Sequence, residues 1–397
     1  MDKDLEKLIE DKKVPADSKP RIFNLSKQSD AQEIKLLSAS GKIQTVVDDF
    51  KQQHEELFAI NNPTKVYTPD FKKEFEAYYD QLAQISSVIM QGNWVYYPWL
   101  ATLVHLIEDV DFQRVRTARN RNLINEEEQK KFYNSVVGVG GLSVGNSVTL
   151  AIVLQGGAKH LRLADFDALA LTNLNRIRGG VESLGLKKVE MTARQIYALN
   201  PYAEIEIFPD GLNPNNIEKF FSGPPKLDIV IDELDNIAVK YLIREQAKKY
   251  GVPVVMGADN GDNAVVDVER YDLDPNTLFF HGRLGNVSYE QLLNLDKFGI
   301  GRTITQHIGP ENITEKMQNS LLEMGKTIVS WPQLGGAALL NGSAVAYCVR
   351  KILNGQSIEG NRALISLDEK LDSEYNTKEA QAQRNKVTEN FKKIMGL

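Results

Sequence analysis

The chain has 397 residues and a formal net charge of −6, with 42% hydrophobic and 25% charged side chains. This length suits two domains or one large domain with an appendage, and the charge argues against nucleic acids as partners, because a phosphate backbone needs a basic protein surface. No run of about eighteen apolar residues would span a bilayer, and the charged N-terminus (MDKDLEKLIEDKK) lacks the apolar core of a signal peptide, so we expect a cytoplasmic protein without membrane attachment.

The first 115 residues have the pattern of a mainly helical region. Apolar residues recur at helical spacing from Asp30 to Ile60, and a second helical run extends from Pro69 to about Met90. The next segment, GNWVYYPWLATLVHLIE from Gly92 to Glu108, begins with aromatic residues and is interpreted as turning into an amphipathic helix. We therefore predict an N-terminal helical region over residues 1–115 and a second domain over residues 116–397.

After Tyr133 the pattern changes to alternating strands and helices. Short apolar runs rich in valine and isoleucine are separated by helical runs over Asn146 to Leu154, Glu182 to Leu199 and Asn236 to Tyr250. The strand-like runs are NSVVGVG, HLRLADFD, AEIEIFP, KLDIVIDE and VPVVMGAD. Strands separated by helices of this length indicate βαβ units. The fold class is therefore predicted to be α/β, with a Rossmann-like, mostly parallel sheet covered by helices.

The chain beyond about residue 265 is less regular. VVDVERYDLDPNTLFF is read as further strands, and YEQLLNL and ENITEKMQNSLLEM are read as helices. The run from Gly335 to Leu353 is a long apolar helix of small residues, which suits close packing. The charged tail from Asp368 to Lys392 is read as a surface helix.

A glycine-rich turn follows the first of the predicted strands. Four glycines, Gly138, Gly140, Gly141 and Gly145, lie in GVGGLSVG. Glycines at a strand-to-helix junction let the backbone approach a phosphate, and the following helix offers free N–H groups. The alternative is a tight turn without a ligand. Asp165 and Asp167 lie about 20 positions on, where a dinucleotide site holds a ribose hydroxyl.

The residues after this acidic pair distinguish an enzyme that binds ATP from one that transfers hydride. Thr172-Asn-Leu-Asn-Arg176 follows, with Arg178 behind it. Arginine binds polyphosphate oxygens well because its donors form a planar fork. In a nicotinamide-dependent oxidoreductase these residues would have no role. The alternative is a pair of arginines that are solvated on a loop.

Two later motifs add charges of both signs. Gly185-Leu-Lys-Lys188 places lysines near a helix start, which is electrostatically unfavourable unless an anion is near. Asp232-Glu-Leu-Asp-Asn236 places carboxylates at the carboxyl end of a strand, the edge at which parallel sheets bind ligands. A carboxylate that faces phosphates there needs a cation between them, most simply Mg²⁺. The alternatives are solvated lysines and a carboxylate that caps the next helix.

Taken in order, these motifs resemble those of the ThiF/MoeB-type adenylyltransferases, the superfamily of ubiquitin-activating enzymes, over roughly residues 116–355. The family's DxDxVxxSNLxRQ pattern is similar to the run from Asp165 to Arg176, its GxxK pattern to Gly185–Lys188, and its (T/C)DN pattern to residues 234–236. The resemblance implies that the glycine turn and Asp165 hold ATP. It also implies phosphate contacts by Asn173, Arg176 and Lys188, and Mg²⁺ binding by Asp235.

An arginine-rich run precedes the first strand. Arg116-Thr-Ala-Arg-Asn-Arg-Asn122 is similar to the family's RxxRQ segment. In dimeric members the second arginine reaches into the partner's site and contacts the terminal phosphates. The resemblance therefore implies a homodimer in which Arg119, or alternatively Arg121, has this role. The other interpretation is that these are ordinary surface arginines.

The sequence also departs from the family pattern. Ser143 makes the glycine turn irregular, the zinc-binding CxxC pairs are absent, and no cysteine lies between Met256 and Tyr271, where many members carry the thioester cysteine. The one cysteine, Cys348, falls in an apolar helix and is read as an inert buried thiol. With the five histidines scattered, we expect no dedicated metal centre of cysteine and histidine.

The resemblance implies that the protein adenylates a carboxylate with ATP and releases pyrophosphate. The carboxylate is the C-terminus of a peptide or a ubiquitin-like protein, or a small acid, and the acceptor attacks the adenylate directly. We expect substrate selection in the helical region before residue 115 and in residues 279–331. Two other functions stay open, a nucleotide-binding scaffold without catalysis and a NAD-dependent oxidoreductase.

Overall fold

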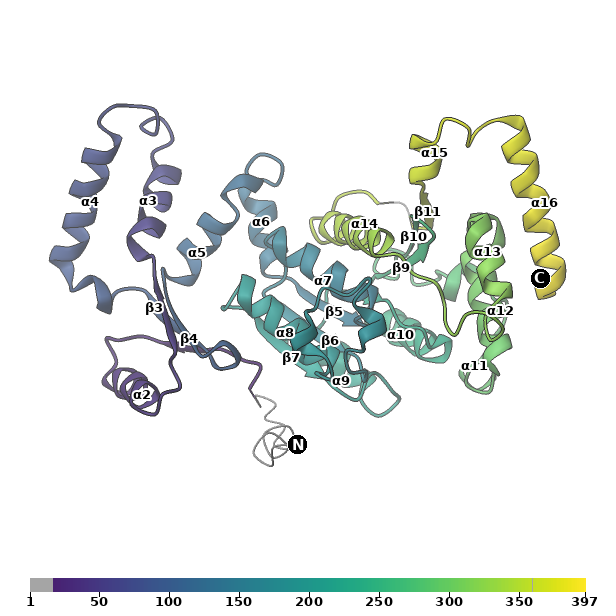
Figure 1. Cartoon of the computed structure of the whole chain (residues 1–397), viewed down its shortest axis with the longest axis horizontal. Helices are drawn as coiled ribbons and strands as arrows, with labels where there is room; N and C mark the ends of the chain where they lie inside the picture. Colours follow the sequence, from purple (N-terminus) through teal and green to yellow (C-terminus); the bar gives the residue numbers. More distant parts are fainter. Residues whose placement is uncertain (1–16, 359) are drawn as a thin grey trace, which may run out of the picture. The chain divides into compact units, whose positions relative to one another are not determined.

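The computed structural model describes residues 17–358 and 360–397 (Figure 1). The chain splits into two compact units, Met1–Glu126 with Ala193–Tyr202, and Glu127–Thr192 with Ala203–Leu397. The charged N-terminal segment MDKDLEKLIEDKK lies outside the described residues.

The first unit combines a four-stranded sheet, in the order β1-β3-β4-β2, with helices. Strands β3 and β4 form an antiparallel hairpin, and β2 pairs with β4 in parallel. The strands are β1 (Arg21–Phe23), β2 (Thr45–Asp48), β3 (Asn93–Tyr97) and β4 (Thr102–Leu106), and the longer helices are α2 (Gln28–Ala39), α3 (Phe50–Asn61), α4 (Phe71–Ile85) and α5 (Asp109–Arg116).

Two predictions for this unit were wrong. The amphipathic helix expected within Gly92–Glu108 is the β3–β4 hairpin, and the helical reading of Asp30–Ile60 is interrupted by β2. The hairpin turns through Pro98–Leu100, and Ala101 adopts a left-handed conformation with φ 49°. In β4 buried residues alternate with half-buried ones, which is the period of a strand. Valine and the aromatic residues favour this pleated surface over a helix.

The second unit is built on a seven-stranded sheet in the order β11-β10-β9-β8-β5-β6-β7. The predicted Rossmann-like α/β fold is confirmed, because the strands from β7 through β9 pair in parallel and only the β9–β10 and β10–β11 pairings are antiparallel. These strands are β5 (Val136–Gly140), β6 (His160–Ala164), β7 (Glu204–Phe208), β8 (Ile229–Asp232), β9 (Val254–Asn260), β10 (Asn263–Glu269) and β11 (Arg362–Ile365).

Helices cover this sheet (Figure 1). α14 packs on α7 so closely that a Cβ atom at Gly342 would lie 2.8 Å from the backbone carbon of Ser147. α8 begins at Lys188, later than predicted, after a short 3-10 turn. The helices are α6 (Glu126–Tyr133), α7 (Val144–Leu154), α8 (Lys188–Leu199), α9 (Ile217–Ser222), α10 (Ile237–Tyr250) and α14 (Gly335–Leu353).

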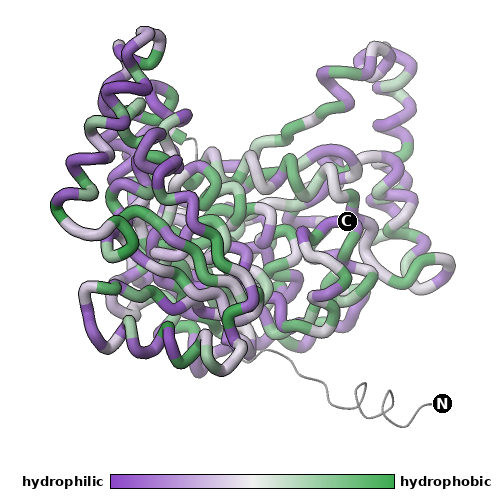
Figure 2. The backbone as a smooth tube through the Cα atoms, turned by 60° about the vertical axis from the view of Figure 1, so that its left-hand side comes forward, coloured by the Kyte–Doolittle hydropathy of each residue, from purple (hydrophilic) through white to green (hydrophobic). Residues whose placement is uncertain are grey.

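The C-terminal part of this unit adds a small helical cluster. α13 contacts α16, and Phe391 and Met395 of α16 join a buried apolar cluster with Ile308 and Met317. Hydrophilic residues predominate along the rest of α16, as expected for the predicted surface helix (Figure 2). The helices of this part are α11 (Tyr289–Leu293), which packs on α10, and α12 (Lys297–Ile308), α13 (Glu315–Leu322), α15 (Leu367–Leu371) and α16 (Lys378–Met395). None of the helices in the described part of the chain is long and apolar enough to cross a membrane.

The sheet register brings three strand ends level with one another. Gly140 at the end of β5 is paired with Ala164 of β6 on one side and with Asp232 of β8 on the other. The chain adds β6 and β7 on one side of β5 and then returns to add β8 on the other. Such a switch point is where open α/β sheets bind ligands beyond the carboxyl ends of their strands.

Candidate nucleotide-binding site

The glycine turn joins β5 to α7 and depends on Gly141. This residue has a φ of +85°, and a Cβ atom there would lie 2.4 Å from the carbonyl oxygen of Glu233. Larger residues are therefore excluded. Gly138, by contrast, is required by packing, since a Cβ atom there would lie 2.7 Å from Leu227 Cδ1. A Cβ at Gly140 would lie 3.2 Å from Leu234 Cδ1, and one at Gly145 3.1 Å from Val139 Cγ1, so both glycines also allow close packing.

Asp165 is fixed directly to this turn. Its Oδ2 accepts a hydrogen bond of 2.7 Å from the backbone N–H of Leu142, and its Oδ1 accepts one of 2.8 Å from the N–H of Asp167. The side chain is buried. Burial raises the pKa of Asp165, and the nearby ammonium of Lys188 and the two N–H donors oppose that shift.

Lys188 is the first residue of α8, and it is buried beside the same two aspartates. Its Nζ lies 2.7 Å from Asp167 Oδ2 and 3.9 Å from Asp165 Oδ2. The anion that a lysine at a helix start requires is therefore supplied, at least in part, by these carboxylates. The structure brings Asp165, Asp167 and Lys188 together at the glycine turn.

Arg176 also contacts the turn. Its Nε donates to Ser143 Oγ at 3.0 Å, and its Nη1 donates to the Thr172 carbonyl at 3.1 Å and to Asn175 Oδ1 at 2.9 Å. Ser143, which breaks the family's glycine pattern, thus supplies the acceptor that holds Arg176. No sequence signal predicts this contact, because it joins residues that are 33 positions apart.

Two aspartates at the carboxyl ends of neighbouring strands lie near Arg176. Asp235 is exposed in the loop after β8, and Asp259 is buried near the end of β9. Partial burial lowers the pKa of Arg176, and the charges of Asp235 and Asp259 oppose that shift. Asp259 was not predicted as a site residue, although its place at the end of an apolar strand run is the same signal that pointed to Asp235.

The remaining predicted residues have local roles or belong to the other unit. Asn173 Oδ1 accepts from the Ala170 N–H at 2.9 Å within its own turn. The cap of α10 is Asn236, whose Oδ1 accepts from the N–H groups of Ala238 and Val239, so Asp235 is not needed for capping. Arg119 and Arg121 lie in the first unit.

The pKa of Asp259 gives a test of the electrostatics around Arg176. Burial raises its pKa from 3.8 to about 6, opposed by amide donors from Asn341 and Gln333 and by the charge of Arg176, and supported by the negative charge of Asp235. The folded protein then holds this proton between about pH 4 and 6, where the unfolded chain has lost it. Stability from this group is present at low pH and is lost as the pH rises through about 6.

We therefore expect Asp259→Asn to gain stability relative to wild type over this interval, by up to about 3 kcal/mol for a shift of about two pKa units at about 1.4 kcal/mol per unit. Urea denaturation of both proteins at several pH values between 4 and 8 measures the difference. Parallel curves for the two proteins would mean that Asp259 ionises normally.

The chain is similar to known proteins over the residues that form this site. Residues 117–270 match the family model described as "ThiF family". An uncharacterized protein of Mycobacterium tuberculosis is 34% identical over 328 residues, which cover 80% of this chain and 45% of that protein. A molybdopterin-synthase adenylyltransferase of Haemophilus influenzae is 26% identical over 222 residues, covering 56% of this chain and 87% of that protein.

Among solved structures, E. coli tRNA N6-threonylcarbamoyladenosine dehydratase in complex with AMP has a TM-score of 0.45 and 18% identity, covering 63% of this chain and 98% of that one. This chain spans less than half the length of the Mycobacterium tuberculosis relative. The resemblance predicted from the motifs is confirmed by the family match and the named adenylyltransferase relatives. Residues 117–270 therefore form a ThiF family domain, and over this part the chain is similar to ThiF/MoeB-type adenylyltransferases.

Proposed function

We propose that this protein is an ATP-dependent adenylyltransferase that activates a carboxylate. A carboxylate oxygen attacks the α-phosphorus of ATP, an acyl-adenylate forms, and pyrophosphate leaves. The observation that carries the proposal is the attachment of Asp165 and Arg176 to adjacent residues of one turn, Leu142 and Ser143. A carboxylate suits a ribose hydroxyl and a guanidinium suits phosphate oxygens, so the turn carries one group for each of these two parts of a nucleotide.

The charged groups around the turn would act by positioning and neutralisation. Arg176 and Lys188 would face the phosphates, and Gly141 would let the backbone approach them, in a turn whose Gly138, Gly140 and Gly145 allow close packing. For Lys188 this requires its ammonium to be shared between the nucleotide and Asp167, to which it is already paired. Asn173 would contribute through its amide nitrogen, since its oxygen is used within the turn.

Asp235 is the proposed ligand of Mg²⁺. It is an exposed carboxylate near Arg176, and it is free of the capping role that Asn236 fills. Within the described residues no group of three or more His, Cys, Asp or Glu side chains is arranged to hold a metal ion by itself. This donor set fits Mg²⁺, which is usually held by one or two carboxylates together with substrate phosphates. When bound, the ion would neutralise charge on the phosphates.

The acceptor would attack the adenylate without an enzyme thioester. The one cysteine, Cys348, is partly buried in α14, and burial raises the pKa of its thiol, which disfavours the reactive thiolate. An amine nitrogen that attacks the acyl carbon forms the new C–N bond, AMP leaves with the electron pair of the broken C–O bond, and the amine loses a proton. We also propose a cytoplasmic homodimer in which Arg119 or Arg121 of one protomer reaches the phosphates in its partner.

The direct test is ATP–pyrophosphate exchange with added carboxylates, accompanied by unfolding measurements with nucleotides. We expect exchange that depends on a carboxylate, and stabilisation of the protein by ATP with Mg²⁺ but not by NADH. A scaffold without catalysis would be stabilised by ATP and would show no exchange with any carboxylate. Stabilisation by NADH alone would instead favour an oxidoreductase.

A further inference from the structure

Ser143 lies where the glycine turn ends and α7 begins. It is the N-cap residue of α7, and a serine in this position commonly accepts a hydrogen bond from a backbone N–H two or three residues further on. The side chain of Ser143 makes no such capping bond. Its Oγ instead accepts the hydrogen bond of 3.0 Å from Arg176 Nε. The hydroxyl group therefore serves the site and not the end of the helix.

The hydroxyl group of Ser143 also has a hydrogen to donate. A serine oxygen can accept one hydrogen bond and donate another at the same time, and within residues 17–358 and 360–397 no acceptor takes this hydrogen. Ser143 is only partly buried, so an acceptor from outside the chain can reach it. In the same part of the chain, the backbone N–H groups of Ser143, Val144 and Gly145 have no acceptor either. An anion with several oxygens, such as a phosphate, satisfies donors grouped in this way.

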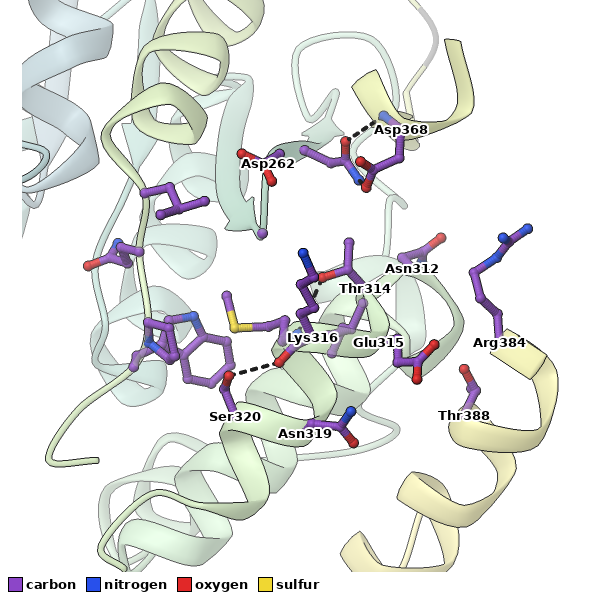
Figure 3. A pocket seen from close by; sticks show the side chains of 18 of the residues that line it. Asp262, Asn312, Thr314, Glu315, Lys316, Asn319, Ser320, Asp368, Arg384 and Thr388 are labelled. Carbon is purple, nitrogen blue, oxygen red and sulfur yellow. Dashed lines mark hydrogen bonds between the residues drawn. The ribbon is translucent and has the colours of Figure 1, made fainter. Parts of the chain in front are cut away.

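Arg176 needs a fixed orientation, because carboxylates lie on several sides of it. The two aspartates at the ends of β8 and β9 are near it. It also lines a cleft of about 1260 Å³, whose walls carry the carboxylates of Asp262, Glu315 and Asp368 (Figure 3). A guanidinium that rotates freely can pair with any of these groups. The bond to Ser143 ties Nε to the turn, and Nη2, which has no acceptor among the described residues, is left to bind a phosphate oxygen.

Resting on the nucleotide site proposed above, we propose that Ser143 binds the triphosphate directly, with its Oγ accepting from Arg176 Nε while its hydroxyl hydrogen is donated to a phosphate oxygen. The side chain thus binds the phosphates and holds the guanidinium toward them. A glycine at this position, as in the family's pattern, has no side chain for either role. The irregular residue of the turn is therefore a nucleotide ligand that is specific to this sequence.

The test measures the dissociation constant of ATP with Mg²⁺ by calorimetry for the wild type and two variants. Ser143→Ala removes the hydroxyl group, and we expect binding to weaken by a factor of about 10 to 100, since hydrogen bonds to charged groups contribute more than neutral ones. Ser143→Thr keeps a hydroxyl group at the same place and should bind ATP nearly as tightly as the wild type.

Ser288→Ala is the matched control. Ser288 is also the N-cap of a helix in the second unit, but its Oγ does accept from a backbone N–H, that of Gln291 at 3.3 Å. Loss of this cap should lower the midpoint of urea denaturation and leave the binding of ATP unchanged. Ser143→Ala should show the opposite pattern, because it removes no capping bond.

A double-mutant cycle distinguishes a direct bond to the phosphates from an effect that acts through Arg176. If the hydroxyl group donates to a phosphate oxygen, Ser143→Ala still weakens ATP binding in a protein that already carries Arg176→Ala. We expect a further loss of about fivefold in that background, the usual contribution of one hydrogen bond.

Three results would overturn direct binding by Ser143. They are wild-type affinity for ATP in Ser143→Ala, equal losses in the alanine and threonine variants, and an effect of Ser143→Ala that vanishes in the Arg176→Ala background. All three leave adenylation in place. ATP binding that depends on Ser143, without ATP–pyrophosphate exchange on any carboxylate, would instead refute the proposed enzyme and keep this ligand. If the wild type does not bind ATP with Mg²⁺, both proposals fail.

Discussion

Replacing Arg176 with alanine is expected to slow ATP–pyrophosphate exchange by a factor of about 10²–10³, the usual cost of removing one preorganised donor from a charge-stabilising site. The guanidinium is half-buried between Ser143 and Asn175, so it is already held in place before a substrate binds. Exchange rates and the ATP dissociation constant of the purified variant measure the effect.

Two further variants separate this effect from loss of folding. Arg176→Lys keeps the positive charge but not the fork that reaches Ser143, and we expect an intermediate rate. Arg114→Ala removes an exposed arginine of α5, which pairs with Asp111, and should leave exchange unchanged. Wild-type exchange in a folded Arg176→Ala protein would remove Arg176 from the phosphate site.

Replacing Arg244 with alanine is expected to lower the free energy of unfolding by about 3–5 kcal/mol, because breaking a buried ion pair leaves uncompensated charge. Arg244 is fully buried, with Nη1 2.6 Å from Asp232 Oδ2 and Nε 2.8 Å from Glu269 Oε2. Despite complete burial, Lys240 and Arg244 hold the pKa of Asp232 below its usual value. Urea denaturation of the variant and the wild type gives the difference.

The matched control on the same helix is Lys249→Ala. Lys249 pairs with Glu218 at 2.8 Å, but both side chains are more than half exposed, so its removal should leave the unfolding free energy nearly unchanged. Similar losses from the two variants would show that burial of Arg244 does not determine its contribution. Exchange activity per folded molecule should persist in both, since neither residue belongs to the glycine turn.

Strands β5 to β9 of the second unit could be predicted because each is a short apolar run bounded by turn residues and separated from the next by a helix. The hairpin at Asn93–Leu106 was missed because its aromatic and aliphatic residues are dense enough to suit either a helix or a strand. Only the pairing between its two halves decides between them, and pairing is a tertiary property.

The features of the site also divide into those that could be predicted from the sequence and those that could not. Asp165, Arg176, Lys188 and Asp235 could be proposed because each lies in a motif with fixed spacing. The contact of Arg176 with Ser143, the pairing of Lys188 with Asp167 and the burial of Asp259 could not, because each depends on how segments distant in the chain pack together.

The aligned ends of strands β6, β5 and β8 affect which substitutions the protein tolerates. Ala164, Gly140 and Asp232 are paired across the sheet, so the residues that come next are placed by the interior of the domain. A slip of one residue in this pairing would turn every side chain of a strand to the opposite face, so the buried side chains would leave the core. The loops can therefore change in sequence and accept new substrates, while the hydrophobic core determines where a nucleotide can bind.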